Sequence, residues 1–303
     1  MKRSQRRAAE TEVASSEPAK RLEPGLYLVA TPIGNARDIT LRALDVLGSC
    51  DAIAAEDTRV TRRLLELHGI PLGQRPMLPY HDRNGVEIRP RIAAWLEEGL
   101  SVAYCTDAGT PLVADPGYRL VRLAAEGGYP VTTLPGPSAT LAALSLSGLP
   151  TDRFLFAGFL PPKAAQRARA LSELSTVPAT LVFFESPHRV VESVAAMADV
   201  LGPDRPAALA RELTKRFEEV RRQPLGEMAT TLREDGPPRG EIVIVIGQRP
   251  HGSAPSEATI DEALRNALAE MSLKDAANSV SSALGLPRKT VYARALALSQ
   301  QGD

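Results

Sequence analysis

The chain has 303 residues, of which 44% are hydrophobic and 24% are charged, and its 36 lysines and arginines balance 36 aspartates and glutamates. This composition is typical of a globular protein long enough for two domains, and it excludes a chain that binds nucleic acid through its overall charge. The two cysteines, Cys50 and Cys105, favour buried thiols over a disulfide framework.

The N-terminal segment, residues 1–23, is polar and basic at its start. It lacks the apolar core of a signal peptide, and no run of about 18 apolar residues occurs elsewhere in the chain. We therefore expect a disordered basic tail, no membrane partner and a cytoplasmic location.

Between residues 24 and 150, short apolar and β-branched runs alternate with amphipathic helical patterns. The sequence predicts strands at 25–30, 51–55, 75–80, 101–105 and 130–134, and helices at 42–50 and 58–69. This alternation predicts an N-terminal α/β domain with a mainly parallel sheet.

A second α/β domain is expected over residues 151–250. The predicted strands are 154–161, 179–186, 206–214, 217–222 and 240–247, and the predicted helices are 160–174, 188–202 and 226–235. The last strand is almost continuously apolar, which is typical of a strand buried on both faces. The polar, Pro/Gly/Ser-rich segment that follows marks a domain boundary.

The C-terminal segment, residues 257–303, contains three helical patterns with a glycine turn before the last one. This arrangement resembles a helix-turn-helix. The alternative is a small packing or dimerisation bundle, because the presumed reading helix carries only Arg288, Lys289 and Arg294 as basic residues.

Four polar loops follow predicted strands of the first domain. They are TPIGNARD (31–38), EDTR (56–59), TDAGTPLVADPG (106–117) and PGPSA (135–139). In a parallel sheet these loops emerge at the same carboxyl edge, where ligands bind. Neither dinucleotide nor P-loop glycine patterns occur; Gly34, Gly109 and Gly136 instead lie on separate loops, where each allows close backbone approach to a compact ligand.

The motifs TPIGN, AEDTR, DAGTPLVADPG, LPGPSA, FFESPHR and ARELTK follow one another in this order between residues 25 and 250. They resemble the bacterial small-subunit ribosomal RNA methyltransferase I family of the tetrapyrrole methylase superfamily, and the C-terminal segment resembles that family's helical extension. Thr106 stands where the family usually has serine, so a hydroxyl is retained.

The resemblance implies two α/β/α domains with S-adenosylmethionine in the cleft between them, plus the helical extension. It further implies a homodimer that methylates the ribose 2'-hydroxyl of a decoding-centre cytidine in 16S rRNA, and we expect the 30S subunit to be the substrate. No metal site is expected.

By the same resemblance, residues of both domains bind the cofactor. These are Pro32, Gly34, Asp107, Gly109, Thr110, Pro111, Pro135, Gly136 and Ser138 of the first domain and Phe184, Ala210 and Glu241 of the second. Asp107 is assigned to recognition, not to catalysis. A carboxylate near the sulfonium would stabilise the ground state more than the transition state, because the sulfur loses its charge as the methyl group leaves.

Methyl transfer needs an oxygen aligned with the sulfur–methyl bond, and a ribose hydroxyl needs help in losing its proton. The catalytic candidates are Glu56, Asp57 and His188, although Asp57 could equally cap a helix and His188 could be structural. Contacts with the RNA are expected from Arg59, His81, Glu185, Arg189, Arg211 and Lys215. Basic clusters near a cleft would bind phosphates, but each could also be a solvated helix face.

Two alternatives remain open at this stage. A small-molecule methylase acting on a tetrapyrrole would share the cofactor loops, although the helical extension and the basic clusters favour RNA. A non-enzymatic regulator that binds RNA or DNA through the extension would not need the catalytic loops at all.

Overall fold

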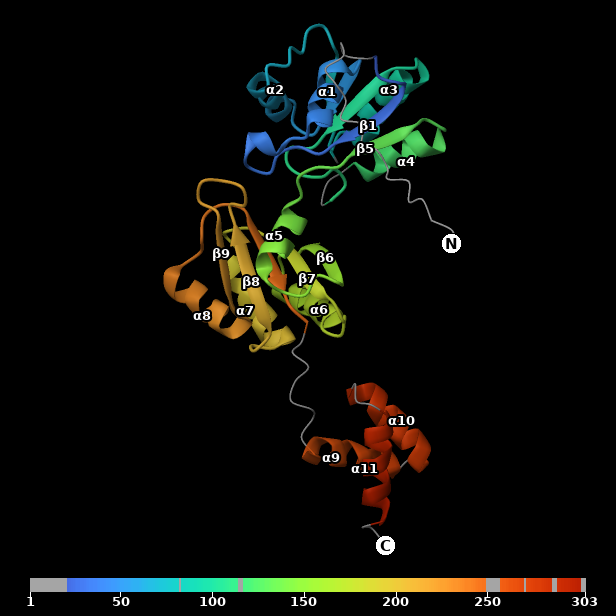
Figure 1. Ribbon diagram of the computed structural model, residues 1–303, viewed down its shortest axis with the longest axis vertical. Helices are drawn as coiled ribbons and strands as arrows, with labels where there is room; N and C mark the ends of the chain where they lie inside the picture. Colours follow the sequence, from blue (N-terminus) through green and yellow to red (C-terminus); the bar gives the residue numbers. More distant parts are fainter. Residues whose placement is uncertain are drawn as a thin grey trace, which may run out of the picture.

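Five parallel strands form the first sheet, in the order β3-β2-β4-β1-β5. Figure 1 labels its strands β1 and β5 and the helices α1 to α4 around it. The computed structural model describes residues 21–81, 83–113, 117–248, 257–269, 271–284 and 288–300. The elements of the first unit are β1 (Gly25–Val29), η1 (Ala36–Asp38), α1 (Leu41–Ser49), β2 (Ala52–Ala55), α2 (Thr58–Leu67), β3 (Met77–Pro79), α3 (Gly85–Glu97), β4 (Ser101–Cys105), α4 (Tyr118–Glu126) and β5 (Val131–Leu134). The parallel sheet expected from the sequence is confirmed.

Helices cover both faces of this sheet. Leu47 and Leu65 of α1 and α2 pack on one face, and Ile92 and Leu120 of α3 and α4 pack on the other. Strands β2 and β4 are buried along their whole length, as central strands covered on both faces must be. Cys50 and Cys105 are buried free thiols, as predicted, and burial raises the pKa of each.

The second sheet is mixed and has the order β6-β7-β10-β8-β9. Its elements are β6 (Phe154–Phe159), α6 (Ala164–Leu174), β7 (Thr180–Glu185), α7 (Val190–Leu201), β8 (Pro206–Arg211), β9 (Glu219–Pro224), α8 (Leu225–Asp235) and β10 (Ile242–Ile246). Strand β10 runs antiparallel to both of its neighbours, β7 and β8, and is buried throughout, as its apolar sequence indicated.

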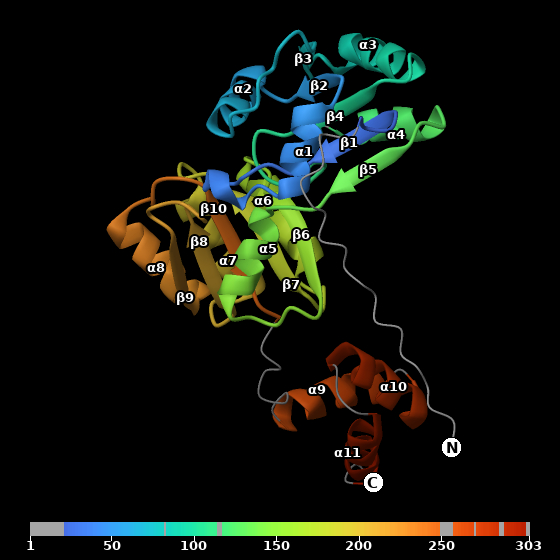
Figure 2. The same ribbon diagram turned by 45° about the horizontal axis from the view of Figure 1, so that its top comes forward.

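Helix α5 (Ala139–Ser147) packs on the second sheet, although it precedes the expected domain boundary at residue 150. Its Ala143 and Leu144 contact Val182, Ala208 and Val245, while α6, α7 and α8 cover the opposite face. Figure 2 shows α5 lying against the second sheet. The second unit is therefore also an α/β/α sandwich, completed by a helix that follows directly from the first sheet.

Three helices form a separate C-terminal unit: α9 (Glu257–Leu268), α10 (Leu273–Leu284) and α11 (Arg288–Gln300). Leu264, Val280 and Val291 belong to its core, and the Arg294 guanidinium pairs with the Asp261 carboxylate at 2.6 Å. Within the described parts of the chain, no helix is long and apolar enough to cross a membrane.

Candidate active site

Three of the four polar loops form one hydrogen-bonded unit at the carboxyl edge of the first sheet. Thr31 and Gly109 exchange backbone hydrogen bonds, each of 3.0 Å between nitrogen and oxygen. The Thr106 hydroxyl donates to the Gly109 carbonyl at 3.0 Å, and the Thr110 hydroxyl donates to the Pro137 carbonyl at 2.8 Å. The loops after β1, β4 and β5 are therefore held in fixed positions relative to one another.

Two glycines are required for this arrangement. Gly109 has φ +85°, which a residue with a side chain rarely adopts. At Gly136, a Cβ atom would lie 2.8 Å from Cβ of Ala30, the residue directly after β1. The close approach of loop to strand at this position therefore excludes a side chain.

The fourth loop, after β2, contains Asp57 at the N-cap of α2. Its carboxylate accepts a hydrogen bond from the Arg59 amide at 2.8 Å and pairs with the Arg59 guanidinium at 2.6 Å. These hydrogen bonds lower the pKa of Asp57 to about 2. Asp57 therefore caps the helix, which was one of its two possible roles.

Glu56 and Asp107 connect this loop to the loop after β4. The Asp57 amide donates to Oδ1 of Asp107 at 2.9 Å, and the Asp107 amide donates to Oε2 of Glu56 at 3.1 Å. The pKa of Asp107 is raised, and burial of the carboxyl group is the largest cause of this rise.

Two cavities adjoin the Thr31–Gly109 bridge: Gly109 lines one, and Thr31 lines the other. The first, here called the interdomain cavity, has a volume of about 360 Å³ and lies between the loops and the second sheet. The second, the α2 cavity, has a volume of about 390 Å³ and lies against helix α2. Neighbouring loop residues face different cavities: Ile33 lines the first, whereas Pro32 and Gly34 line the second.

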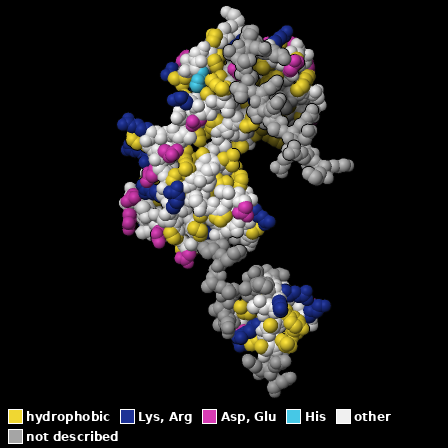
Figure 3. Space-filling view, viewed as in Figure 1, with side chains coloured by type: hydrophobic (Ala, Val, Ile, Leu, Met, Phe, Trp, Pro, Cys, Tyr) yellow, Lys and Arg dark blue, Asp and Glu magenta, His cyan; other side chains and the backbone are white. Residues whose placement is uncertain are grey.

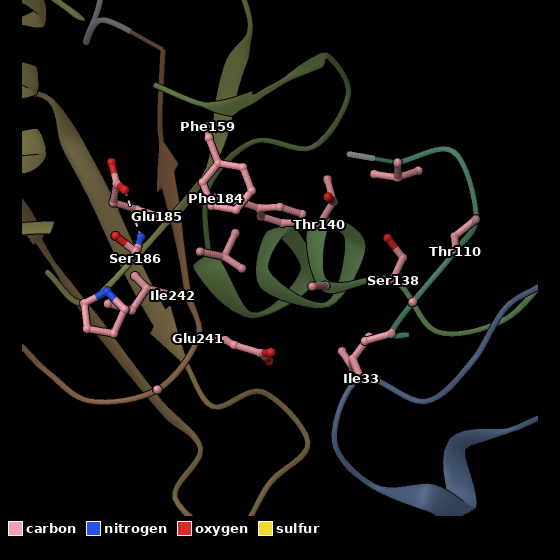
Figure 4. Close-up of a pocket in the computed structure, with 17 residues that line it drawn as sticks. Ile33, Thr110, Ser138, Thr140, Phe159, Phe184, Glu185, Ser186, Glu241 and Ile242 are labelled. Carbon is pink, nitrogen blue, oxygen red and sulfur yellow. Dashed lines mark hydrogen bonds between the residues drawn. The ribbon is translucent and has the colours of Figure 1, made fainter. Parts of the chain in front are cut away.

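Residues from both units line the interdomain cavity (Figure 4). Ile33, Thr110 and Ser138 lie on one side, and Phe184, Glu241 and Ile242 lie on the other. The Thr140 hydroxyl lines this cavity, is buried, and has no hydrogen-bond partner among the described residues. A buried hydroxyl without a partner is energetically unfavourable, so a bound molecule that supplied one would be stabilised here. The buried Thr61 hydroxyl of the α2 cavity has the same property among the described residues. On the face shown in Figure 3, apolar side chains gather around the junction of the two units.

A loop of the second unit contacts the first unit directly. The Asn35 amide donates to the Thr214 hydroxyl at 3.0 Å, and a Cβ on Gly34 would lie 2.9 Å from the Leu213 carbonyl oxygen. In the same loop, the Lys215 ammonium donates to Oε2 of Glu241 at 3.0 Å. The loop therefore connects the TPIGN motif to the wall of the interdomain cavity.

In the ESPHR motif, Glu185 and Arg189 are held by their own unit. The buried Glu185 carboxylate accepts hydrogen bonds from the Ser193 hydroxyl at 2.5 Å and from the Arg189 guanidinium at 3.2 Å. Arg189 also donates to the Leu160 carbonyl at 2.5 Å. His188, in contrast, is exposed next to Pro187, which lines the cavity.

The structure divides the predicted site residues into three groups. At the interdomain cavity are Gly109, Thr110, Ser138, Phe184, Glu185 and Glu241. At the α2 cavity are Pro32, Gly34, Arg59 and Asp107. The linings of these two cavities do not include Glu56, Asp57, His81, Pro111, Pro135, Gly136, His188, Arg189, Ala210, Arg211 and Lys215.

Some residues in the last group have structural contacts instead. The side chain of Ala210 packs in the core beside Val243, and the Arg211 guanidinium pairs with Glu219 at 2.6 Å. The sequence analysis missed Thr140 and Phe159, which both line the interdomain cavity. A signal existed for each: Thr140 follows the PGPSA motif, and Phe159 follows a glycine inside a strand, which suggests a bulge.

Comparisons with known proteins identify the family. The model of tetrapyrrole (corrin/porphyrin) methylases matches residues 25–229, and that of the RsmI C-terminal HTH domain matches residues 254–299. Ribosomal RNA small subunit methyltransferase I from Mesorhizobium japonicum is 50% identical over 94% of this chain and 97% of its own length. The chain belongs to the ribosomal RNA small subunit methyltransferase I family.

The protein of the same name from Escherichia coli O157:H7 is 44% identical over 91% of this chain and 96% of its own length. The family predicted from the motifs is therefore confirmed, and the expected methyltransferase class agrees with it.

Solved structures confirm the expected fold. A cobalt precorrin-4 methyltransferase aligns with a TM-score of 0.55 at 17% identity and covers 73% of this chain and 94% of its own. A uroporphyrin-III C-methyltransferase from Thermus thermophilus, complexed with S-adenosylhomocysteine, aligns with a TM-score of 0.51 at 22% identity. The alignment covers 74% of this chain and 97% of the Thermus chain. The expected cofactor, S-adenosylmethionine, agrees with these matches.

Proposed function

We propose that this methyltransferase uses S-adenosylmethionine to methylate the ribose 2'-hydroxyl of a decoding-centre cytidine in 16S rRNA. The observation that carries the proposal is the identity of 50% over 94% of the chain with a ribosomal RNA small subunit methyltransferase I. From the resemblance, the proposal includes the 30S subunit as substrate and a homodimer. From the sequence pattern, it includes a cytoplasmic location and the domain limits given above, with α5 assigned to the second unit.

The chemistry of the interdomain cavity fits the cofactor. Its volume of about 360 Å³ is within the range of small-molecule sites, and it combines apolar walls with a few polar groups. The Thr140 hydroxyl has no partner in the described part of the chain, Ser138 lies nearby, and the left-handed Gly109 lets the backbone approach a ligand closely. When bound there, the cofactor supplies an activated methyl group on a positively charged sulfur.

Asp107 has a supporting role in this proposal. Its carboxylate lines the α2 cavity and accepts the Asp57 amide, so it fixes the two loops in position from the α2 cavity. This changes the assignment made from the motifs, in which Asp107 contacted the cofactor directly.

His188 takes the proton of the ribose hydroxyl in the proposed reaction. Asp57 is a weak proton acceptor because its pKa is about 2, and Glu56 is engaged with the Asp107 amide. Imidazole is the most common general base in enzymes, and His188 lies exposed beside a residue of the cavity wall. In this proposal, the hydrogen-bonded loops after β1, β4 and β5 hold the cofactor so that its methyl group lies in line with the ribose oxygen. Such alignment can supply much of the rate.

The α2 cavity offers a surface for RNA phosphates. Arg59 and Arg63 line it, and their side chains are 88% and 68% exposed. Exposed arginines bind phosphate oxygens in bidentate geometry. All four basic residues are paired with carboxylates, but the side chains of Arg211 and Lys215 are only 23% and 29% exposed. Arg59 and Arg63 are therefore more accessible to RNA and are the stronger candidates.

The proposal is tested by transfer of labelled methyl groups from S-adenosylmethionine to three substrates: 30S subunits from cells without this enzyme, protein-free 16S rRNA, and a precorrin. Primer extension that is sensitive to ribose methylation maps the product. We expect incorporation at one decoding-centre cytidine in 30S subunits. Methylation of the precorrin without any methylation of RNA would overturn the proposal in favour of a small-molecule methylase.

A further inference from the structure

The outer strand of the second sheet, β6, contains a bulge next to the interdomain cavity. Phe156 pairs with Val182 and Gly158 with Phe183, so Ala157 is an extra residue in the register with β7. Gly158 has φ +66°, the left-handed conformation that glycine adopts in such bulges.

The bulge determines where Phe159 points. Leu155 and Ala157 face the core beneath α6 to α8, and Phe156 faces the core beneath α5. Because side chains alternate along a regular strand, Phe159 would share the face of Leu155 and Ala157 if β6 continued without a bulge. The bulge moves it to the other face, on the side of the interdomain cavity.

On that face, Phe159 joins an aromatic cluster. Its ring centroid lies 5.7 Å from that of Phe184, and the Phe156 ring centroid lies 4.8 Å from the same ring. Phe159 lines the interdomain cavity and yet is 56% exposed, whereas Phe184 is partly buried. Figure 4 shows the two rings side by side at the cavity. The chain therefore uses a bulge to present a flat apolar ring to solvent at the edge of the cavity.

We propose that the exposed ring of Phe159 stacks on a nucleobase of the RNA substrate at the edge of the interdomain cavity. Aromatic side chains hold unstacked RNA bases in this way. This inference rests on the proposed function. The adenine of the cofactor offers the same flat surface, but Ser138, which fits the cofactor, lies on the other side of the cavity, and Phe159 is more exposed than Phe184.

The kinetic test compares Phe159→Leu with Phe154→Leu. Leucine keeps an apolar side chain but removes the aromatic face, and Phe154 is a matched control because it lies on the same strand, is 42% exposed and does not line the cavity. We expect Phe159→Leu to raise KM for the 30S subunit about 10-fold, in line with the strength of base stacking, and to leave KM for S-adenosylmethionine within about twofold. Phe159→Tyr retains the wild-type KM for 30S.

Three kinetic outcomes overturn the inference while leaving the proposed function intact. They are an unchanged KM for 30S in Phe159→Leu, a rise in KM for the cofactor alone, and an equal effect in Phe154→Leu. If the wild-type protein methylates no RNA, the proposed function itself fails.

A fluorescence measurement tests stacking without relying on catalysis. Phe159→Trp is introduced in a Trp95→Phe background, because Trp95 is the only native tryptophan. We expect a 16S rRNA fragment with the decoding-centre segment to quench the new tryptophan when S-adenosylhomocysteine is already bound. Quenching by S-adenosylhomocysteine alone would assign the ring to the adenine and overturn the inference. So would a bound RNA that causes no quenching, or a change of oligomeric state in Phe159→Leu on gel filtration.

Discussion

Asp57 and Asp107 are joined across two loops, because the Asp57 amide donates a hydrogen bond to Oδ1 of Asp107 at 2.9 Å. The Asp107 amide in turn donates to Glu56, so the loops after β2 and β4 are linked in both directions. The acidic residue of the DAGTP motif therefore has a structural partner in the EDTR motif, which explains why it lies on the α2 side of the bridge.

Replacing Asp107 separates a structural role from cofactor recognition. Asp107→Asn keeps an oxygen for the Asp57 amide, so we expect S-adenosylhomocysteine to bind within about threefold of wild type and the fold to stay intact. Asp107→Ala leaves that amide without its acceptor and lowers the free energy of unfolding by about 1 kcal/mol. Calorimetric titration measures the affinity for S-adenosylhomocysteine, and chemical denaturation measures the free energy of unfolding. If Asp107→Asn no longer bound S-adenosylhomocysteine at all, the Asp107 carboxylate would have to contact the cofactor directly, and the structural role would be wrong.

The stability of the enzyme in acid depends on Asp57. Its pKa falls to about 2 in the folded state through hydrogen bonds from Arg59, against about 3.9 in an unfolded chain. A carboxyl group with a lowered folded pKa stabilises the protein above the unfolded pKa, and this contribution is lost as the pH falls towards 2. Asp57→Asn still caps the helix but carries no charge. Wild type is therefore expected to unfold at a higher temperature than Asp57→Asn at pH 6, with the difference shrinking between pH 4 and pH 2; a constant difference would contradict this.

Removing the Thr140 hydroxyl affects the free and bound protein in opposite ways. Thr140→Val eliminates a buried hydroxyl for which the described residues provide no partner, so the ligand-free protein becomes more stable by up to about 1 kcal/mol. The same change removes a contact to the bound molecule, and we expect the Kd for S-adenosylhomocysteine to rise about 10-fold. Thr132→Val, at an exposed position of β5, is the matched control and changes neither value. Unaltered affinity in Thr140→Val would exclude the hydroxyl from the site.

A methyl group at Gly34 interferes with the contact between the two units. A Cβ there would lie 2.7 Å from the Thr214 hydroxyl oxygen and 2.9 Å from the Leu213 carbonyl oxygen, so the loops must move apart. We expect Gly34→Ala to lose about 1–3 kcal/mol of unfolding free energy and to raise KM for S-adenosylmethionine. At Gly48 of α1 a Cβ meets no atom within 4 Å, and Gly48→Ala should gain about 0.5 kcal/mol with normal kinetics. If Gly34→Ala and Gly48→Ala had the same unfolding free energy and the same KM, the contact of Gly34 with the loop of the second unit would be unimportant.

The sequence predicted the strands and the four loops well, because β-branched runs and turn residues act locally. It did not reveal that α5 belongs to the second sheet, since the apolar residues around Ala143 do not specify which sheet they cover. Strand direction was likewise hidden: the continuous apolar run of β10 fits a parallel or an antiparallel neighbour equally well.

The site was predicted only in part for a related reason. The motifs contain residues of both the interdomain cavity and the α2 cavity. The Thr31–Gly109 bridge between these residues is made by backbone atoms, so no pattern of side chains in the sequence predicts which cavity each residue lines. Asp57 illustrates the limit: the same carboxylate suits a base or a cap, and only the 2.8 Å hydrogen bond from the Arg59 amide decides between them.

Nucleoside mass spectrometry of 16S rRNA from cells lacking the gene, complemented with wild type, Thr132→Val or Thr140→Val, tests the central claim most directly. The account predicts that one 2'-O-methylated cytidine in the decoding-centre fragment disappears in the deletion strain. Wild type and Thr132→Val should restore it fully, and Thr140→Val only partly when S-adenosylmethionine is limiting. Unchanged methylation of every cytidine in the deletion strain would contradict the account.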